Sequence, residues 1–148
     1  MVDVEVRTIA AQPIVVAPRS VDPSEVSSAI VPALDAVWQF VRAEGLETGH
    51  NVAIYQAAGD GQLAAWFGVE VTSPFEGTCS INCSYLPMGK AAVAVHKGPY
   101  DRIGATNQAI RAWCAEQGLA LSGTSFEIYG DWTEDPDELE TTIAYQLA

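Results

Sequence analysis

Basic residues are scarce in this chain. Its 148 residues include seven Lys and Arg against 19 Asp and Glu, which gives a formal net charge of −12. Binding to nucleic acids or to anionic membrane surfaces requires clusters of Lys and Arg that neutralise phosphate groups. The few basic residues are scattered along the sequence, so we expect neither a nucleic acid nor a membrane as a partner.

The chain has few cysteines and no long apolar run. The three cysteines, Cys79, Cys83 and Cys114, are odd in number and lack the spacing of a disulfide framework. Cys79 and Cys83 would lie about 13 Å apart along a strand, too far to share a metal ion. No apolar stretch reaches the roughly 18–20 residues of a membrane span, and the N-terminus does not resemble a signal peptide. We therefore expect a reduced, cytoplasmic protein with no metal site and no cofactor.

Familiar catalytic loops are absent as well. The turn "GDGQ" (59–62) is not followed by Lys-Ser/Thr or by a helix start, so it is not a phosphate-binding loop. There is no Gly-x-Ser-x-Gly nucleophile elbow. Any activity therefore has to come from residues outside these common motifs.

What the sequence does contain is the material of one globular domain, with 49% apolar and 18% charged residues. Alternating residues predict strands over 2–9 and 13–18, and helical periodicity predicts a helix between Asp22 and Gly45. A hairpin is predicted over 51–71, and further strand material over 79–100 with a break at 87–89. A second helix is predicted over 101–119, with Asp101 as its N-cap, followed by strands over 125–132 and 139–148.

The two halves of the chain resemble each other. Residues 40–56 match residues 113–130 at an offset of 73–74, so that Gly45 pairs with Gly118 and "AIYQ" pairs with "EIYG". We interpret residues 1–148 as a single α+β domain of two β-α-β-β units, about 1–75 and 76–148. These units are predicted to form one antiparallel sheet with two helices on one face and a ligand cleft on the other.

Glu127 stands out against this repeat. It aligns with Ala53, whereas Tyr129 aligns with Tyr55, so the scaffold does not require a carboxylate at this position. Strand alternation places Glu127 and Tyr129 on one face and Phe126 on the other. The simple alternative is that Glu127 lies on a solvated strand face.

The run "LPMGKAAVAVHKGPYDRIGATNQAIRAWCAEQGL" (86–119) resembles the GyrI-like, effector-binding domain family, whose hallmark is Leu-Pro-x-Gly, a small-apolar strand and His-x-Gly-Pro-Tyr before a helix. The strand "FEIY" is similar to the family's Glu-bearing strand, with Glu127 at the motif position. The likeness extends over roughly 3–147. It implies a stand-alone member of a family that includes the effector-binding domains of bacterial multidrug-responsive transcription activators. The chain departs from those activators in lacking a helix-turn-helix, which puts a DNA-binding role in doubt.

The resemblance leaves three functions open. The first is capture of lipophilic or aromatic, cationic small molecules, with Glu127 as the counter-charge. The second is hydrolysis of cyclopropane-containing or other electrophilic antibiotics, with Glu127 as general base and a tyrosine, Tyr55 or Tyr129, polarising a carbonyl. The third is a gyrase-inhibitor-like interaction with a topoisomerase, favoured by the strong negative charge. The sequence does not show whether the protein turns over a substrate or which oligomeric state it adopts.

A cation-binding cleft needs apolar walls and one fixed negative charge, since aromatic rings attract cations through their negative faces. Burial of an unpaired carboxylate is costly or raises its pKa, and a cationic ligand relieves that cost. We interpret His96 and Tyr100 as structural residues. The predicted ligand-binding residues are Glu127, Tyr55, Tyr129, Trp66, Tyr145 and Trp132.

Overall fold

Eight antiparallel strands form a single sheet in the computed structural model, which describes residues 3–58, 60–78, 80–131 and 133–148. The strands are β1 (Glu5–Ile9), β2 (Pro13–Val21), β3 (Thr48–Ala57), β4 (Leu63–Val71), β5 (Asn82–Tyr85), β6 (Gly89–Lys97), β7 (Leu121–Tyr129) and β8 (Glu140–Leu147). The helices are α1 (Val26–Glu44) and α2 (Ile103–Glu116), with short 3-10 turns η1 (Pro23–Glu25), η2 (Tyr100–Arg102) and η3 (Pro136–Glu138). The predicted α+β class with one antiparallel sheet is confirmed. Neither helix, among the residues described, is long and apolar enough to cross a membrane.

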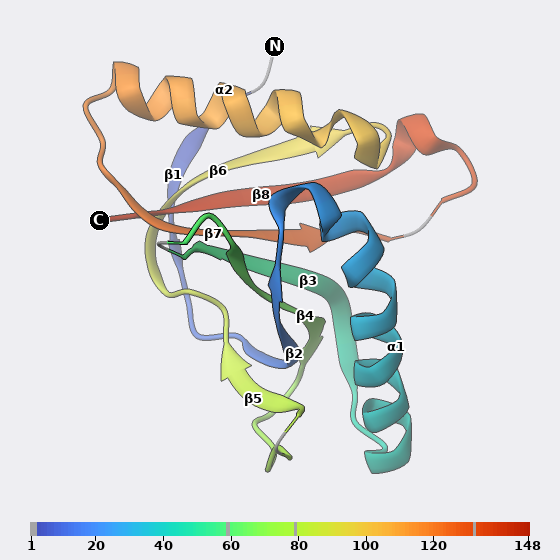
Figure 1. Ribbon diagram of the computed structural model, residues 1–148. Coiled ribbons are helices and arrows are strands. Elements are labelled where there is room, and N and C mark those ends of the chain that lie inside the picture. Colours follow the sequence, from blue (N-terminus) through green and yellow to red (C-terminus); the bar gives the residue numbers. More distant parts are fainter. Residues whose placement is uncertain (1–2, 59, 79, 132) are drawn as a thin grey trace.

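The strand order β1-β6-β8-β7-β3-β4-β2-β5 follows the internal repeat. β2-α1-β3-β4 forms one unit and β6-α2-β7-β8 the other, and β3 pairs with β7 at the centre of the sheet. The pseudo-twofold relation between the units therefore passes between these two strands. β1 and β5 add one edge strand to each side, outside the β-α-β-β units (Figure 1).

Both helices cover the same face of the sheet. Ala53 lies opposite Phe67 on one side and opposite Glu127 on the other, and Glu127 lies opposite Ile143. Residues directly opposite one another share a face. Ala53 and Phe67 pack in the cluster beneath α1, and Ile143 packs in the cluster beneath α2. We call this surface the helix face; in Figure 1, α2 lies across the top and α1 along the right-hand side.

The opposite face of the sheet carries a core of its own. Ile14, Val16 and Val52 are fully buried there, and they cluster with residues of the second half such as Val93 and Phe126. The prediction that the cleft would lie on this second face is wrong. Apolar side chains of both halves fill that face, whereas the two helices leave a gap between them on the other.

Local signals explain the helix boundaries. Asp22 accepts a hydrogen bond of 2.9 Å from the backbone N–H of Ser24, and α1 ends at Gly45 with a φ of 65°, which favours glycine. Gly118 has a φ of 69° just after α2. The expected N-cap at Asp101 is wrong, because this residue lies inside η2 and Pro99 precedes the turn without a side-chain cap.

Candidate functional site

A cleft of about 1320 Å³ opens on the helix face between α1 and α2. The apolar side chains of α1 line one wall, and polar side chains of α2 line the other. Strands β3, β7 and β8 form the floor, which lies at the junction of the two halves. The site is therefore built by the duplication, since each repeat supplies one helix and part of the floor.

Glu127 occupies the middle of this floor. It lies directly opposite Ala53, the residue with which it aligns in the repeat, so the two flank the pseudo-twofold axis. Its carboxylate is half-buried and accepts a hydrogen bond of 2.6 Å from the hydroxyl of Tyr129. None of the ion pairs between described residues includes Glu127. The floor thus holds one carboxylate without a cationic partner in the part of the chain described.

The surroundings shift the protonation of this carboxylate. Burial raises the pKa of Glu127 above its ordinary value, and hydrogen bonds with Tyr129 and Asn107 offset part of the rise. Burial also raises the pKa of Tyr129 and of Tyr55, and the negative charge of Glu127 raises both further. The two phenols therefore stay protonated and can donate hydrogen bonds at neutral pH.

Three predicted tyrosines meet around Glu127. Tyr129 lies two residues along β7, on the same face. Tyr55 comes from β3, lines the cleft and contacts the ring of Phe67 edge-on at 6.0 Å. Tyr145 comes from β8 and lines the side nearer α2. Strand alternation explains all three positions, because odd-numbered residues of β3, β7 and β8 point to the helix face.

A second set of polar contacts runs from α2 to the floor. Arg111 Nη1 donates to the hydroxyl of Tyr145 at 3.0 Å, and this hydroxyl donates to Asn107 Oδ1 at 2.7 Å. The Arg111 guanidinium also lies 5.9 Å from the centre of the Tyr145 ring. Asn107 Nδ2 donates to the backbone carbonyl of Ile103 at 3.1 Å, and Asn107 also lowers the pKa of Glu127.

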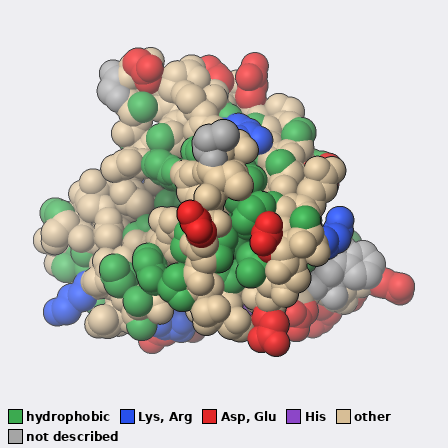
Figure 2. All heavy atoms as spheres, turned by 90° about the horizontal axis from the view of Figure 1, so that it is seen from below, with side chains coloured by type: hydrophobic (Ala, Val, Ile, Leu, Met, Phe, Trp, Pro, Cys, Tyr) green, Lys and Arg blue, Asp and Glu red, His purple; other side chains and the backbone are tan. Residues whose placement is uncertain are grey.

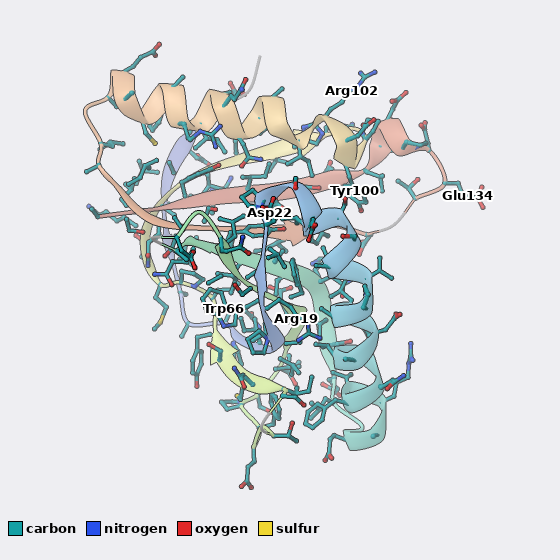
Figure 3. The ribbon with its side chains drawn as sticks, viewed as in Figure 1. Arg19, Asp22, Trp66, Tyr100, Arg102 and Glu134 are labelled. Atoms are coloured by element: carbon teal, nitrogen blue, oxygen red, sulfur yellow. The ribbon has the colours of Figure 1, made fainter. Side chains whose placement is uncertain are left out.

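Tyr100 also belongs to the cleft. It lies at the start of η2, lines the cleft and meets the ring of Tyr129 edge-on at 5.6 Å (Figure 3). His96 holds this corner in place, since its ring nitrogens lie 3.0 Å from the carbonyl of Pro99 and 2.8 Å from the hydroxyl of Thr106. Because a carbonyl only accepts, Nε2 donates to Pro99 and Nδ1 accepts from Thr106. His96 has the structural contacts expected of it, whereas Tyr100 contributes to the cleft wall.

Trp66 does not line the cleft, contrary to expectation. It neighbours Phe67 on β4, and Phe67 shares the helix face with Glu127 through Ala53. Trp66 therefore points to the other face, where it packs against the core of Ile14, Val16 and their neighbours. Figure 3 shows Trp66 well away from Tyr100. Trp132, also predicted for the site, lies outside the described residues.

Sequence reasoning missed Asn107, Arg111 and Tyr100. For Asn107 and Arg111 the repeat carried the necessary signal, whereas Tyr100 aligns with the polar Ser27. An offset of 73 aligns the buried Val37 of α1 with Ile110 of α2, and it places Leu34 in register with Asn107 and Trp38 with Arg111. Polar residues at positions that are apolar in the other half mark the α2 wall in the same way that Glu127 marks the floor.

Comparison with known proteins identifies the family of the chain. A family model described as a GyrI-like small molecule binding domain matches residues 2–148. The chain belongs to this GyrI-like family. A comparison of this GyrI-like chain with curated proteins gives no match.

Solved structures share the GyrI-like fold at low sequence identity. The EcmrR C-terminal domain is 20% identical with a TM-score of 0.83, covering 100% of this chain and 98% of that one. This chain covers 57% of EcmrR in its DNA complex. SAV2435 bound to tetraphenylphosphonium is 13% identical with a TM-score of 0.69, covering 99% and 94% of the two chains. A hydrolase from Listeria innocua is 12% identical with a TM-score of 0.63, covering 98% and 91%.

Proposed function

We propose that this GyrI-like domain captures aromatic, lipophilic cations in the cleft between α1 and α2, with Glu127 as the counter-charge. The observation that carries the proposal is the carboxylate of Glu127, half-buried among tyrosine rings and without an ion-pair partner among the described residues. A buried, unpaired carboxylate is unfavourable, and a bound cation relieves that cost.

The walls suit an aromatic ligand. Ile30, Val31 and Leu34 of α1 provide apolar area on one side, and Tyr55 and Tyr129 provide rings near the carboxylate. A cation over a tyrosine ring gains about 0.5–2 kcal/mol, depending on how far it is removed from water. The structure of SAV2435 with tetraphenylphosphonium contains such a ligand in a protein of the same fold.

The charge of the molecule favours the same class of ligand. Of the described residues that line the cleft, Glu127 is acidic and Arg111 is basic, while the whole chain is strongly acidic. On the face drawn in Figure 2, the described Lys and Arg side chains do not gather into a patch. The long-range field therefore favours cations over anions in the approach to the cleft.

Titration with a matched pair of ligands tests the proposal. Tetraphenylphosphonium is the cation and triphenylphosphine oxide the neutral analogue, with binding followed by calorimetry and tryptophan quenching. Glu127→Gln is expected to weaken cation binding by about tenfold or more, because the charge is lost while the shape remains. Binding of the neutral analogue should change little.

Glu134→Gln serves as the matched control, since Glu134 is exposed and lies outside the cleft (Figure 3). It removes one negative charge of the chain but leaves the floor intact. Unchanged affinity of Glu127→Gln for the cation, or an equal loss in Glu134→Gln, would show that Glu127 is not the counter-charge.

The raised pKa of Glu127 supports hydrolysis as a second candidate, because a carboxylate of raised pKa is a better base near neutral pH. Glu127 would take a proton from water as the water oxygen adds to a cyclopropane carbon. The ring C–C bond breaks, and its electron pair moves onto the conjugated carbonyl, to which Tyr55 donates a hydrogen bond. The proton held by Glu127 then returns to the product. Turnover of a cyclopropane-bearing alkylating antibiotic that is lost in Glu127→Gln supports this activity, and absence of turnover in the wild-type protein excludes it for that substrate.

A further inference from the structure

The α2 wall of the cleft carries a positive charge with unused hydrogen-bonding capacity. A guanidinium has five N–H donors in a planar fork. In the described structure Arg111 makes one side-chain hydrogen bond, to Tyr145, and takes part in none of the ion pairs. Its remaining donors are free for a ligand, and its exposed position at the cleft leaves them accessible.

Arg111 is also held in place. The hydroxyl of Tyr145 accepts from Nη1, and the ring of the same residue lies against the guanidinium. Tyr145 is fixed in turn by its hydrogen bond to Asn107. An arginine already ordered in this way loses less conformational freedom when it binds an acceptor than a free surface arginine does.

The two charges of the cleft both act on the side chain of Tyr145. Arg111 contacts Tyr145 directly. Burial raises the pKa of Tyr145, Arg111 offsets part of that rise, and the charge of Glu127 adds to it. The opposite wall, from α1, is mainly apolar. The cleft thus has a negative floor, a positive rim on the α2 side and an apolar wall across from it.

We infer that the cleft selects zwitterionic aromatic compounds, in which the cationic ring system lies over Glu127 and a carboxylate or similar acceptor is held by Arg111. This inference rests on the proposed function and narrows its ligand class. A simple lipophilic cation satisfies Glu127 but leaves the donors of Arg111 to water. A ligand with a carboxylate on the same aromatic body satisfies both, because Arg binds carboxylates through two parallel hydrogen bonds.

Two dyes that differ in one group provide the test. Rhodamine B carries a cationic xanthene and a free carboxylate, and its ethyl ester is a cation without the carboxylate. Fluorescence anisotropy gives the dissociation constants of both dyes at pH 7.5. The wild-type protein should bind rhodamine B at least as tightly as the ester. Arg111→Gln should weaken rhodamine B about tenfold and leave the ester within twofold.

Two further variants separate a local contact from a general charge effect. Arg102→Gln removes a positive charge at an exposed residue that points away from the sheet and does not line the cleft (Figure 3). It should alter neither dye. Arg111→Lys keeps the charge without the planar fork and should restore only part of the affinity for rhodamine B. Circular dichroism checks that each variant is folded.

The outcomes separate a failure of this inference from a failure of the proposed function. An Arg111→Gln protein that weakens both dyes equally, or neither, overturns the inference, as does a wild-type protein that binds the ester but not rhodamine B. An Arg102→Gln protein that matches Arg111→Gln overturns it too. If Glu127→Gln leaves binding of the ester unchanged, the proposed function fails, whatever the effect at Arg111.

Discussion

The α1 and α2 walls of the cleft come from equivalent parts of a duplicated unit, yet they present different chemistry. α1 contributes Leu34 to its wall, whereas α2 contributes Asn107, in register with Leu34, and Arg111. The residues that pack beneath the helices are closer in kind, with Val37 matched by Ile110. Packing against the sheet constrains the buried face of each helix, whereas the face toward the cleft was free to diverge.

On the cleft floor, the two halves differ in the same way at one pair of aligned residues. Ala53 and Glu127 face each other across the pseudo-twofold axis, but Ala53 is fully buried beneath α1, whereas Glu127 opens to the cleft. A symmetric scaffold therefore produced an asymmetric site through a few substitutions in one half. The comparison can be tested by exchanging residues between the halves.

The largest effect is expected from Ala53→Glu, which copies the floor of the second half into the first. The new carboxylate would be buried beneath α1 and directly opposite Glu127, so we expect the free energy of unfolding to fall by about 3–5 kcal/mol. Urea unfolding at pH 7 measures the change. Ala53→Gln, of nearly equal size, is the control for steric cost, and equal destabilisation by Glu and Gln would contradict the electrostatic explanation.

A pH titration tests whether burial raises the pKa of Glu127 in the folded protein. The folded-state pKa of Glu127 is raised, so its favourable contribution is complete below the ordinary glutamate value and is lost as pH rises through the raised value. Unfolding free energies of the wild-type protein and Glu127→Gln should therefore differ progressively from about pH 4 upward, to the disadvantage of the wild type. Cation affinity should rise over the same window, by about tenfold, because only the carboxylate attracts the ligand. A difference that does not vary with pH would argue against the raised pKa.

Asn107→Leu gives the α2 wall the residue that α1 has at Leu34. The pKa of Glu127 should rise further, because one of the two hydrogen bonds that lower it is removed. Carbon-13 NMR of the glutamate carboxyls measures this shift directly. The reciprocal change, Leu34→Asn, should weaken binding of aromatic cations and leave the pKa of Glu127 in place. If the pKa of Glu127 is the same in Asn107→Leu and in the wild-type protein, Asn107 does not stabilise the Glu127 carboxylate.

Tyr100→Ser, which copies Ser27 of the first half, is expected to have the smallest effect. Tyr100 is 44% exposed, so the free energy of unfolding should change by less than about 0.5 kcal/mol. Affinity for aromatic cations should fall about threefold to tenfold as the edge-on ring is lost. Tyr85→Ser is the matched control, since Tyr85 is 42% exposed and lies outside the cleft. Equal losses in both variants would assign Tyr100 no part in the cleft.

The predicted elements agree closely with the structure where the signal is local. Asp22 and Gly45 bound the first helical region as predicted, and the break at residues 87–89 separates β5 from β6. The tyrosines predicted from strand alternation, Tyr55 and Tyr129, share a face with Glu127 as expected. The prediction for Trp66 failed because alternation states that Trp66 and Phe67 point to opposite faces, but not which of them points to the cleft.

The amino-acid sequence by itself determined the types of element, their order, the duplication and the presence of one carboxylate that the repeat does not require. These follow from neighbouring residues, through caps, turns and the periods of strands and helices. Only the tertiary structure decided on which face of the sheet the cleft lies and that Arg111 and Asn107 of α2 both contact Tyr145 on its floor. Those features depend on where each helix packs and on strand register, which are set by contacts between residues far apart in the chain.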